Sequence, residues 1–425
     1  MCRLKWIDSE RPRARGDFAR AAFYAALVST ITTAYGQEQL SLNDAVREAL
    51  TSHPLLAAET QRIAVARDFV QQAGLRPNPR LILQSENWSF SGSPSDPIGS
   101  TFTDHFLYAS QIFETGGKRQ RRIDFAQAGV ELTTSDRELL ARQVATRVKL
   151  AYWSAVGAQA VLDLLRATQQ NFTQTIQFHE TQLREGAIAE AEVIRVRLEG
   201  DRVRLAVENA SREAEIAQIA LFQAMGRDRF AVVRLSDSLE RVSEPVPSDL
   251  DQALLARVEV RRAREVVDQA RAGLRLQQAI ARPDVEILSG YKRTAGFNTA
   301  MWGAQINLPF FNKNQGNIAA AESEIRVAES RLAATERQVR AEVESAMRDV
   351  QKRRDLLASL MARSLRRAQE SANIARAAYR EGGTDLLRLL DSERVVIELE
   401  VQNARLRAEY QQSLVALEAA MGVEP

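Results

Sequence analysis

One long segment occurs twice in this chain, and this duplication restricts the possible folds more than any other feature. Residues 184–226 align with 380–422 at a constant offset of 196 positions, without a gap. Each copy opens on a glycine-containing break and closes on Met-Gly. Two equal segments with matching ends predict the descending arms of two helical hairpins related by duplication. The alternative, a chance alignment of two Ala- and Glu-rich helices, leaves the coincidence of both breaks and both ends unexplained.

The length and charge of the chain fit a single duplicated architecture. Its 425 residues could hold two or three domains, but few Pro- and Gly-rich boundaries are present. Lys and Arg total 57 against 55 Asp and Glu, so there is neither a basic field for nucleic acid nor an acidic tail. We therefore expect no nucleic-acid partner, and two structural repeats, 37–226 and 250–425, joined by a connector over 227–249.

The first 36 residues resemble a secretory signal peptide. Arginines precede an apolar run over 21–34, and the small residues Ala34 and Gly36 stand where a signal peptidase cleaves, before Gln37. This run is too short for a transmembrane helix, which needs about 20 residues, and no later stretch is long or apolar enough. Because the only cysteine is Cys2, we expect an exported chain without a disulfide or a lipid-bearing cysteine. A disordered basic tail is the alternative.

Helices are predicted over most of the remaining chain. Apolar residues recur at helical spacing over 42–50, 54–73, 117–184, 187–225, 250–280, 316–380 and 383–421. At 1.5 Å per residue the longest of these extend roughly 100 Å, far beyond a globular core. Such helices must bury their apolar stripes against neighbours, so we expect a curved wall in which 54–73 and 250–280 stack end to end with the shorter arms. His53 is expected to cap a helix before Pro54, and Arg257-Val258 predicts a softer break at the matching place.

Four runs with strand composition form two pairs, and each pair predicts a hairpin. They cover 79–90 and 102–113 in the first half, and 285–292 and 301–308 in the second. Runs of about ten residues with one apolar or aromatic face are typical of strands that cross a bilayer about 30 Å thick. Four strands do not close a barrel unless several chains contribute. A small soluble sheet packed on the helices is the alternative.

Several motifs, in this order along the chain, resemble the TolC family of outer-membrane efflux channels over residues 40–422. They are ALTSHPLL at 49–56 with PNP at 77–79, QIFETGGKR at 111–119, LPFFNKNQGNI at 308–318, and the two Arg-Glu-Gly turns. The third is most similar to the CzcC and CusC branch, which serves heavy-metal efflux pumps of the resistance-nodulation-division (RND) class. Other members of the family serve drug efflux or type I secretion.

The resemblance implies a mainly α fold with a membrane β-barrel. Long α-helical hairpins would form an α-barrel through the periplasm, and three chains would each give four transmembrane strands to a twelve-stranded barrel in the outer membrane. The implied partners are two further copies of the chain in a homotrimer, a periplasmic adaptor protein, an inner-membrane RND pump and outer-membrane lipid. The implied function is the exit duct of a tripartite efflux system.

The resemblance also assigns roles at the hairpin turns. Adaptor docking is expected at the two turns, which comprise Arg184, Glu185, Gly186, Arg380, Glu381, Gly382 and Gly383. Glycine permits the backbone of a tight turn, so these glycines could serve only as helix caps. The gate candidates are Tyr379, Thr384, Asp385 and Arg388.

Each gate candidate has an expected role at the periplasmic end of the tunnel. We expect Thr384 to cap the following helix and Asp385 from three chains to form an acidic ring that favours cations. Arg388 or Tyr379 would tie neighbouring hairpins together in the closed state. In the simpler alternative Asp385 only complements the positive end of the helix and Arg388 is solvated.

The residues do not suggest an enzyme, a cofactor or a metal site. The three histidines, His53, His105 and His179, stand on unrelated predicted elements, and no acid, base and nucleophile converge. A metal site would need clustered His, Cys or Met. A periplasmic adaptor is the main rival function, because adaptors also contain long helical hairpins behind a signal. Adaptors usually have one hairpin flanked by small β domains, however, and this chain has two hairpins and two strand pairs. A plain coiled-coil scaffold explains neither the strands nor the signal.

Overall fold

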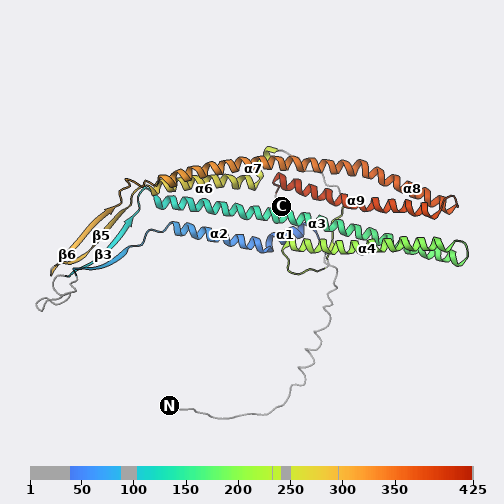
Figure 1. Ribbon diagram of the computed structural model, residues 1–425, viewed down its shortest axis with the longest axis horizontal. Helices are drawn as coiled ribbons and strands as arrows, with labels where there is room; N and C mark the ends of the chain where they lie inside the picture. Colours follow the sequence, from blue (N-terminus) through green and yellow to red (C-terminus); the bar gives the residue numbers. More distant parts are fainter. Residues whose placement is uncertain (1–38, 88–102, 232, 241–249, 295, 424–425) are drawn as a thin grey trace, which may run out of the picture.

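The computed structural model describes residues 39–87, 103–231, 233–240, 250–294 and 296–423. The expected signal over 1–36 lies outside these residues. So do 88–90 and 102, which are the ends of the first two predicted strand runs, and the polar segment 91–101 between them. In Figure 1 the molecule is elongated, with strands at one end, two helical hairpin turns at the other and long helices between them. Secretion therefore stays a prediction.

The helices follow the same order on both sides of the connector. The first half contains α1 (Leu42–Ser52), α2 (Pro54–Ala73), α3 (Lys118–Arg184) and α4 (Glu190–Met225). The second half contains α5 (Leu250–Ala256), α6 (Val258–Ile280), α7 (Gln315–Asp355), a π-helical segment (Leu356–Met361), α8 (Ala362–Arg380) and α9 (Leu386–Met421). The predicted helical stretches are thus confirmed. Among the described residues, no helix is both long enough and apolar enough to cross a bilayer.

His53 and Arg257 interrupt the helices with the same backbone geometry. Their φ and ψ are −64° and 124° at His53, and −71° and 122° at Arg257. His53 Nδ1 accepts a hydrogen bond from the Leu55 N–H at 3.2 Å, which confirms its capping role. The expectation of a softer break at Arg257 is wrong. Its buried guanidinium holds the break by donating to the Ala420 carbonyl at 3.1 Å and to the Glu342 carboxylate at 2.7 Å.

Each short arm is continued end to end by the helix that follows one of these breaks. A Cβ on Gly226, at the end of α4, would lie 2.9 Å from the His53 ring, and a Cβ on Gly422, at the end of α9, would lie 3.0 Å from the Ala256 carbonyl carbon. Both glycines have positive φ, at 75° and 71°, so glycine suits both junctions. Figure 1 shows α2 in line with α4 and α6 in line with α9, which confirms the predicted stacking.

The two predicted hairpins join into one antiparallel sheet of order β2-β3-β5-β6. Its strands are β2 (Arg80–Glu86), β3 (Asp104–Phe113), β5 (Val285–Thr294) and β6 (Phe297–Ile306). The seam between the halves is β3 against β5. At this seam a Cβ on Gly290 would lie 2.3 Å from the Leu107 carbonyl oxygen, so the strands can approach only because residue 290 is glycine.

A second, two-stranded sheet holds the connector against the helices, and the sequence did not predict it. β1 (Gln39–Leu40) pairs in parallel with β4 (Arg234–Leu235). The hydroxyl of the buried Tyr152 lies 2.9 Å from the Leu40 carbonyl oxygen and 2.6 Å from a carboxylate oxygen of Asp237. Burial, followed by the hydrogen bond to Asp237, raises the pKa of Tyr152. Strands of two residues carry no periodicity, so the connector gave no signal of them.

The two long helices run in register through the middle of the molecule. Val148 on α3 and Val343 on α7 are 195 residues apart and both are fully buried. Nearer the turns the offset is 196, since the buried His179 matches the buried Ala375. The second half therefore has one extra residue between these positions. The π-helical segment Leu356–Met361 accommodates it, because a π-turn holds one more residue than an α-turn.

Candidate functional site

The candidate site is the end of the molecule at which the two hairpins reverse. The first turn joins α3 to α4, and Gly186 has a φ of 72° there. Its N–H donates to the Leu183 carbonyl at 3.0 Å, and the Ala187 N–H donates to the Gln182 carbonyl at 2.9 Å. These bonds satisfy carbonyls that the end of α3 would leave free. Arg184 and Glu185 are exposed beside them.

The second turn joins α8 to α9 with the same geometry. Gly382 has a φ of 70°. Its N–H donates to the Tyr379 carbonyl at 3.1 Å, and the Gly383 N–H donates to the Ala378 carbonyl at 2.8 Å. Arg380, Glu381 and both glycines are exposed. The glycine-dependent reversal is thus present at both turns, whereas adaptor docking there stays a prediction.

Near its tip each hairpin is crossed by an ion pair, and the charges of this pair are reversed between the two hairpins. In the first, Arg197 on α4 donates to Glu180 on α3 through two nitrogens, at 2.6 and 3.0 Å. In the second, Arg376 on α8 donates to Glu393 on α9 at 2.5 and 3.0 Å. Glu180 stands 196 residues before Arg376, as Arg197 does before Glu393. The same two positions therefore tie both hairpins with opposite polarity.

The gate candidates Asp385 and Arg388 lie at the start of α9, where one expectation is wrong. The N-cap of α9 is Asp385 and not Thr384, because a carboxylate oxygen of Asp385 accepts from the Arg388 N–H at 2.9 Å. The helix thus begins one residue later than expected, and Thr384 lies outside it. Both Asp385 and Arg388 are exposed, which agrees with the simpler alternative of a helix cap. An acidic ring of Asp385 is not tested by one chain.

Tyr379 ties the two hairpins of the same chain together through His179. The Tyr379 hydroxyl lies 3.2 Å from His179 Nε2, and their rings stack with centroids 6.2 Å apart. His179 Nδ1 lies 2.8 Å from the Thr175 carbonyl, which can only accept, so Nδ1 carries a hydrogen. In the neutral ring Nε2 therefore accepts from the Tyr379 hydroxyl. Burial, followed by the negative charge of Glu192, raises the pKa of Tyr379.

The importance of His179 was missed from the sequence. Its contact with Tyr379 joins residues 200 positions apart, which no local pattern reveals. One signal was available: at the offset of 196, His179 falls on a position that holds the small, buried Ala375 in the second hairpin. Beneath the pair, Val196, Leu386 and Leu390 form a small buried cluster that packs the hairpins together.

The described residues offer no catalytic or metal-binding constellation. Within them, no three His, Cys, Asp or Glu side chains approach closely enough to hold a metal ion. His53 caps α2, His105 lies on β3, and His179 lies on α3, so the three histidines stay apart. The arrangement is that of a helical wall that ends in two turns, and the part of the chain that the structure describes brings together no set of groups for acid–base or nucleophilic chemistry.

Comparisons with known proteins agree with this architecture. The family model "Outer membrane efflux protein" matches residues 45–227 and 250–423. The cobalt-zinc-cadmium resistance protein CzcC of Cupriavidus metallidurans is 23% identical over 386 residues, which cover 90% of each chain. Among solved structures, CusC matches with a TM-score of 0.76 at 21% identity, covering 90% of this chain and 92% of that one. VceC of Vibrio cholerae matches with a TM-score of 0.71 at 20% identity, covering 90% and 96%.

The family match covers both halves and stops at the connector, as the duplication does. It includes both strand pairs, both turns and almost all of the helices, and the two solved structures match over 90% of the chain. The chain belongs to the outer membrane efflux protein family, the TolC family of outer-membrane channels.

Proposed function

We propose that three copies of this chain form the exit duct of a tripartite efflux system for heavy-metal cations. Each copy consists of two repeats, 37–226 and 250–425, joined by the connector 227–249, after removal of a signal over 1–36. The duct receives its cargo from an inner-membrane RND pump through a periplasmic adaptor. The observation that carries the proposal is a four-stranded sheet with two open edges at the end of a helical wall, in a chain of this family.

The open edges of the sheet support the homotrimer. Within the described residues, β2 and β6 each pair on one side only. Unpaired backbone groups are costly in lipid, so a sheet that spans a membrane must close on itself. Four strands are too few for closure, and three copies placed edge to edge supply enough.

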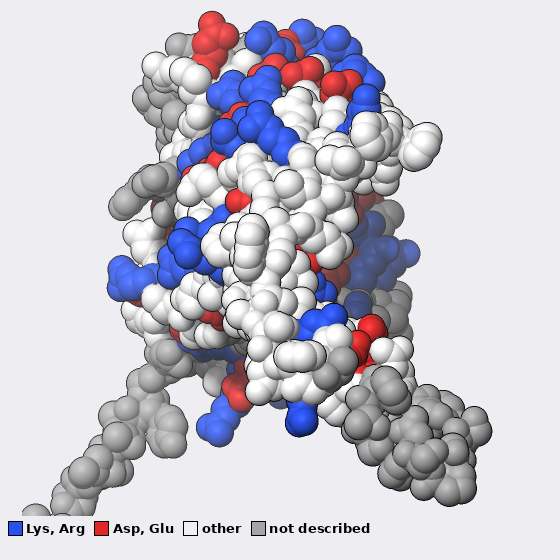
Figure 2. Space-filling model, turned by 90° about the vertical axis from the view of Figure 1, so that its left-hand side faces the viewer, with Lys and Arg blue, Asp and Glu red and all other residues white. Residues whose placement is uncertain are grey.

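The surface of the sheet supports contact with outer-membrane lipid. Large apolar and aromatic side chains are exposed on it, including Leu83 at 75% and Trp302 at 87%. Figure 2, which looks at the strand end of the molecule, shows uncharged residues over the middle of this face, with many of the charged residues gathered toward its upper part. Strands of ten residues rise about 33 Å, which is sufficient to cross the hydrocarbon layer.

The cargo is inferred from the relatives. CzcC is named for resistance to cobalt, zinc and cadmium, and the motif LPFFNKNQGNI resembles that of the same branch. A duct of this kind passes cations and leaves their selection to the pump, so it needs no coordinating cluster. Asp385 at the turn end, repeated in three copies, would favour cations over anions at the entrance.

The turns at 184–186 and 380–383 are the proposed docking surface for the adaptor. They are exposed, they lie at the end opposite the sheet in Figure 1, and both reverse through a glycine with positive φ. Gly186→Trp and Gly382→Trp test docking, because there is open space around both positions and only the turn backbone resists the change. Loss of efflux with a normal yield of trimer supports docking, and normal efflux contradicts it. Gly303→Trp in the sheet is the control for trimer yield.

Metal tolerance of the host tests the cargo. Deletion of the gene should lower the growth-inhibiting concentrations of cobalt, zinc or cadmium salts, and the intact gene should restore them. If tolerance to metals is unchanged but tolerance to drugs or the secretion of a protein is lost, the chain is an outer-membrane channel of another branch. Cell fractionation separates the outer-membrane channels of all these branches from the alternative of a periplasmic adaptor. An adaptor would be absent from the outer-membrane fraction.

A further inference from the structure

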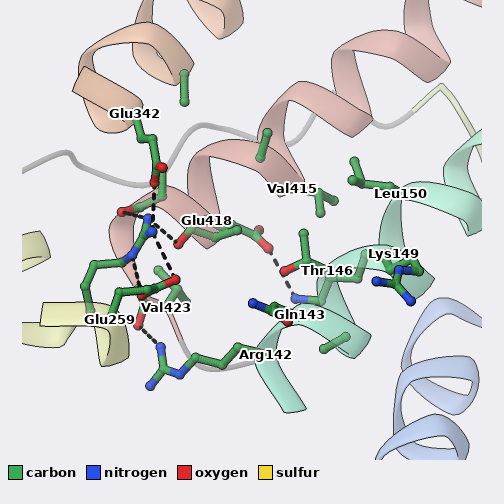
Figure 3. A pocket seen from close by; sticks show the side chains of 18 of the residues that line it. Arg142, Gln143, Thr146, Lys149, Leu150, Glu259, Glu342, Val415, Glu418 and Val423 are labelled. Atoms are coloured by element: carbon green, nitrogen blue, oxygen red, sulfur yellow. Dashed lines mark hydrogen bonds and ion pairs between the residues drawn. The ribbon is translucent and has the colours of Figure 1, made fainter. Parts of the chain in front are cut away.

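The junction between α9 and α6 is held from two sides within one chain. From α7, Glu342 accepts from Arg257 Nη2 at 2.7 Å. From α3, Arg142 Nη1 donates to the carbonyl oxygen of Gly422, the residue that ends α9, at 2.6 Å. A cavity of about 1100 Å³ lies between α3 and α7 at this junction, and Arg142, Glu342 and Val423 line it in Figure 3. Both flanks of the junction are therefore occupied.

The matching junction, between α4 and α2, packs chiefly along α3. Arg227, the residue after Gly226, ties it to α1 by donating to Glu48 through two nitrogens, at 2.6 and 2.5 Å. On the α3 side, Arg147 lies close enough to His53 to lower the pKa of the imidazole, after the larger effect of burial. Arg147 stands 195 residues before Glu342, so this flank is the counterpart of the α7 flank above. In the described part of the chain, no hydrogen bond reaches the carbonyl oxygen of Gly226, the counterpart of Gly422. The second flank of this junction is open.

The register of the long helices identifies the residue that belongs on the open flank. At the offset of 195, Arg142-Gln143-Val144 on α3 meets Arg337-Gln338-Val339 on α7, three identical residues in a row. Arg337 is exposed, and among the described residues it makes neither a hydrogen bond nor an ion pair. The counterpart of the guanidinium that caps α9 is thus present in the sequence and unused in the single chain.

We propose that Arg337 of one copy donates to the Gly226 carbonyl oxygen of the next copy and closes the α4/α2 junction from outside. This inference rests on the proposed homotrimer, and it identifies which surfaces meet. A guanidinium suits this position because the last carbonyls of a helix carry the negative end of its dipole. The contact runs head to tail, since each copy gives Arg337 to one neighbour and receives Arg337 from the other, and three such contacts close a ring.

The same comparison places a second cavity between copies. Within the chain, α9 and α6 lie between α3 and α7. In the ring, α4 and α2 lie between α3 of their own chain and α7 of the neighbour. Gln223 on α4 is the counterpart of Ala419 on α9, which lines the cavity together with Arg142. Gln223 of one copy therefore faces Arg337 of the next.

Two matched cysteine pairs test this placement in a Cys2→Ser background of the full chain, oxidised in isolated outer membranes. Arg337→Cys with Gln223→Cys should link separate chains, so that non-reducing gels show species of two and three chains that reducing agent dissolves. Arg142→Cys with Ala419→Cys is the control and should link only within a chain. Failure of the first pair to link chains that remain oligomeric by mass would overturn the inference while leaving the trimer intact. A protein that is monomeric by mass would refute both.

Single substitutions separate a contact between copies from a role within one chain. Arg337→Gln should lower the temperature at which the oligomer dissociates in mild detergent, and should leave the unfolding of the dissociated chain unchanged. Arg142→Gln should lower the unfolding temperature of the chain itself. Equal effects of the two substitutions on chain unfolding, or an Arg337→Gln oligomer as resistant to dissociation as the parent, would contradict the proposed contact.

Discussion

The two hairpins have the same backbone and opposite chemistry at the same positions. The turn geometry agrees, with φ of 72° at Gly186 and 70° at Gly382. The ion pair that ties each hairpin reverses its sign, with the acid on the ascending helix in the first and the arginine on the ascending helix in the second. A duplicated fold thus retains the position at which a contact is needed, whereas the charges that make the contact can exchange.

The two helix breaks also share their backbone geometry and differ in their chemistry, here in a less exposed environment. His53 lies near the positive charge of Arg147 on α3, whereas Arg257 donates to the carboxylate of Glu342 on α7. Arg147 and Glu342 occupy matching positions of the two long helices. A neutral ring caps one break and a buried cation caps the other. The first tolerates loss of its cap better, because no charge is left without a partner when it is removed.

The largest expected effect is at the seam that joins the halves. Gly290→Ala would place a Cβ 2.3 Å from the Leu107 carbonyl oxygen and 2.4 Å from the Tyr108 Cα, so β3 and β5 could not pair. We expect a cost above about 3 kcal/mol and loss of assembled protein from the outer membrane. Gly303→Ala is the control, since its nearest neighbour is the Leu288 side chain at 3.8 Å. Normal assembly of Gly290→Ala would show that the halves do not join through this seam.

The two helix breaks should differ when each cap is removed. Arg257→Ala leaves two carboxylates and two carbonyls without their buried donor, and we expect a loss of about 3 to 5 kcal/mol. His53→Ala removes a neutral cap and should cost about 1 kcal/mol. Thermal unfolding of both variants in the same detergent measures the difference. Equal losses would contradict the assignment of different chemistry to the two breaks.

A charge exchange across the first hairpin tests whether only position matters. Glu180→Arg alone places two arginines together and should destabilise the tip by up to about 1 kcal/mol, since the pair is exposed. Adding Arg197→Glu gives the first hairpin the polarity of the second and should restore the stability of the tip. Amide hydrogen exchange near Gly186 reports the tip directly. If the double variant protects the tip no better than the single one, the position alone does not carry the contact.

Acid should loosen the first junction and spare the second. Burial, and then Arg147, hold the pKa of His53 below its ordinary value of 6.5. As the pH falls below 6.5, His53 therefore becomes protonated in the unfolded chain before it does in the folded chain. The contribution of neutral His53 to the free energy of unfolding is thus full above pH 6.5 and declines as the pH falls. Arg257 stays charged throughout this range, since its ion pairs raise its pKa despite burial.

Hydrogen exchange between pH 7.5 and 5.5 measures this smallest effect. After correction for intrinsic exchange, amides at the start of α2 should lose protection in the parent protein and keep it in His53→Gln. Amides at the start of α6 should behave alike in both proteins. Equal loss of protection at α2 in parent and variant would assign the change to other groups.

Local signals in the sequence were sufficient for most of the fold. Proline at 54, the glycines at 186 and 382 and the alternating strand runs each fix a backbone geometry, and these elements are present. The last strand run was misplaced, since β6 begins at Phe297, four residues before the predicted start. The break at Arg257 was misjudged because its cause is a set of contacts with α7 and α9, which are distant in sequence.

The candidate site was less predictable because its contacts lie between elements. The turns were recognised, but the helix start at Asp385 depends on one side-chain hydrogen bond that Thr384 was equally able to provide. The Tyr379–His179 contact joins the two halves of the chain, and the π-helical segment reflects one inserted residue that emerges only when buried positions are compared.

The central claim is that the open sheet edges and the open flank of the α4/α2 junction are filled by copies of the same chain. The mass of the assembly extracted from outer membranes in mild detergent, determined by native mass spectrometry, tests this claim directly. A mass of three mature chains is the predicted result. A single folded chain that remains intact in the detergent would contradict it.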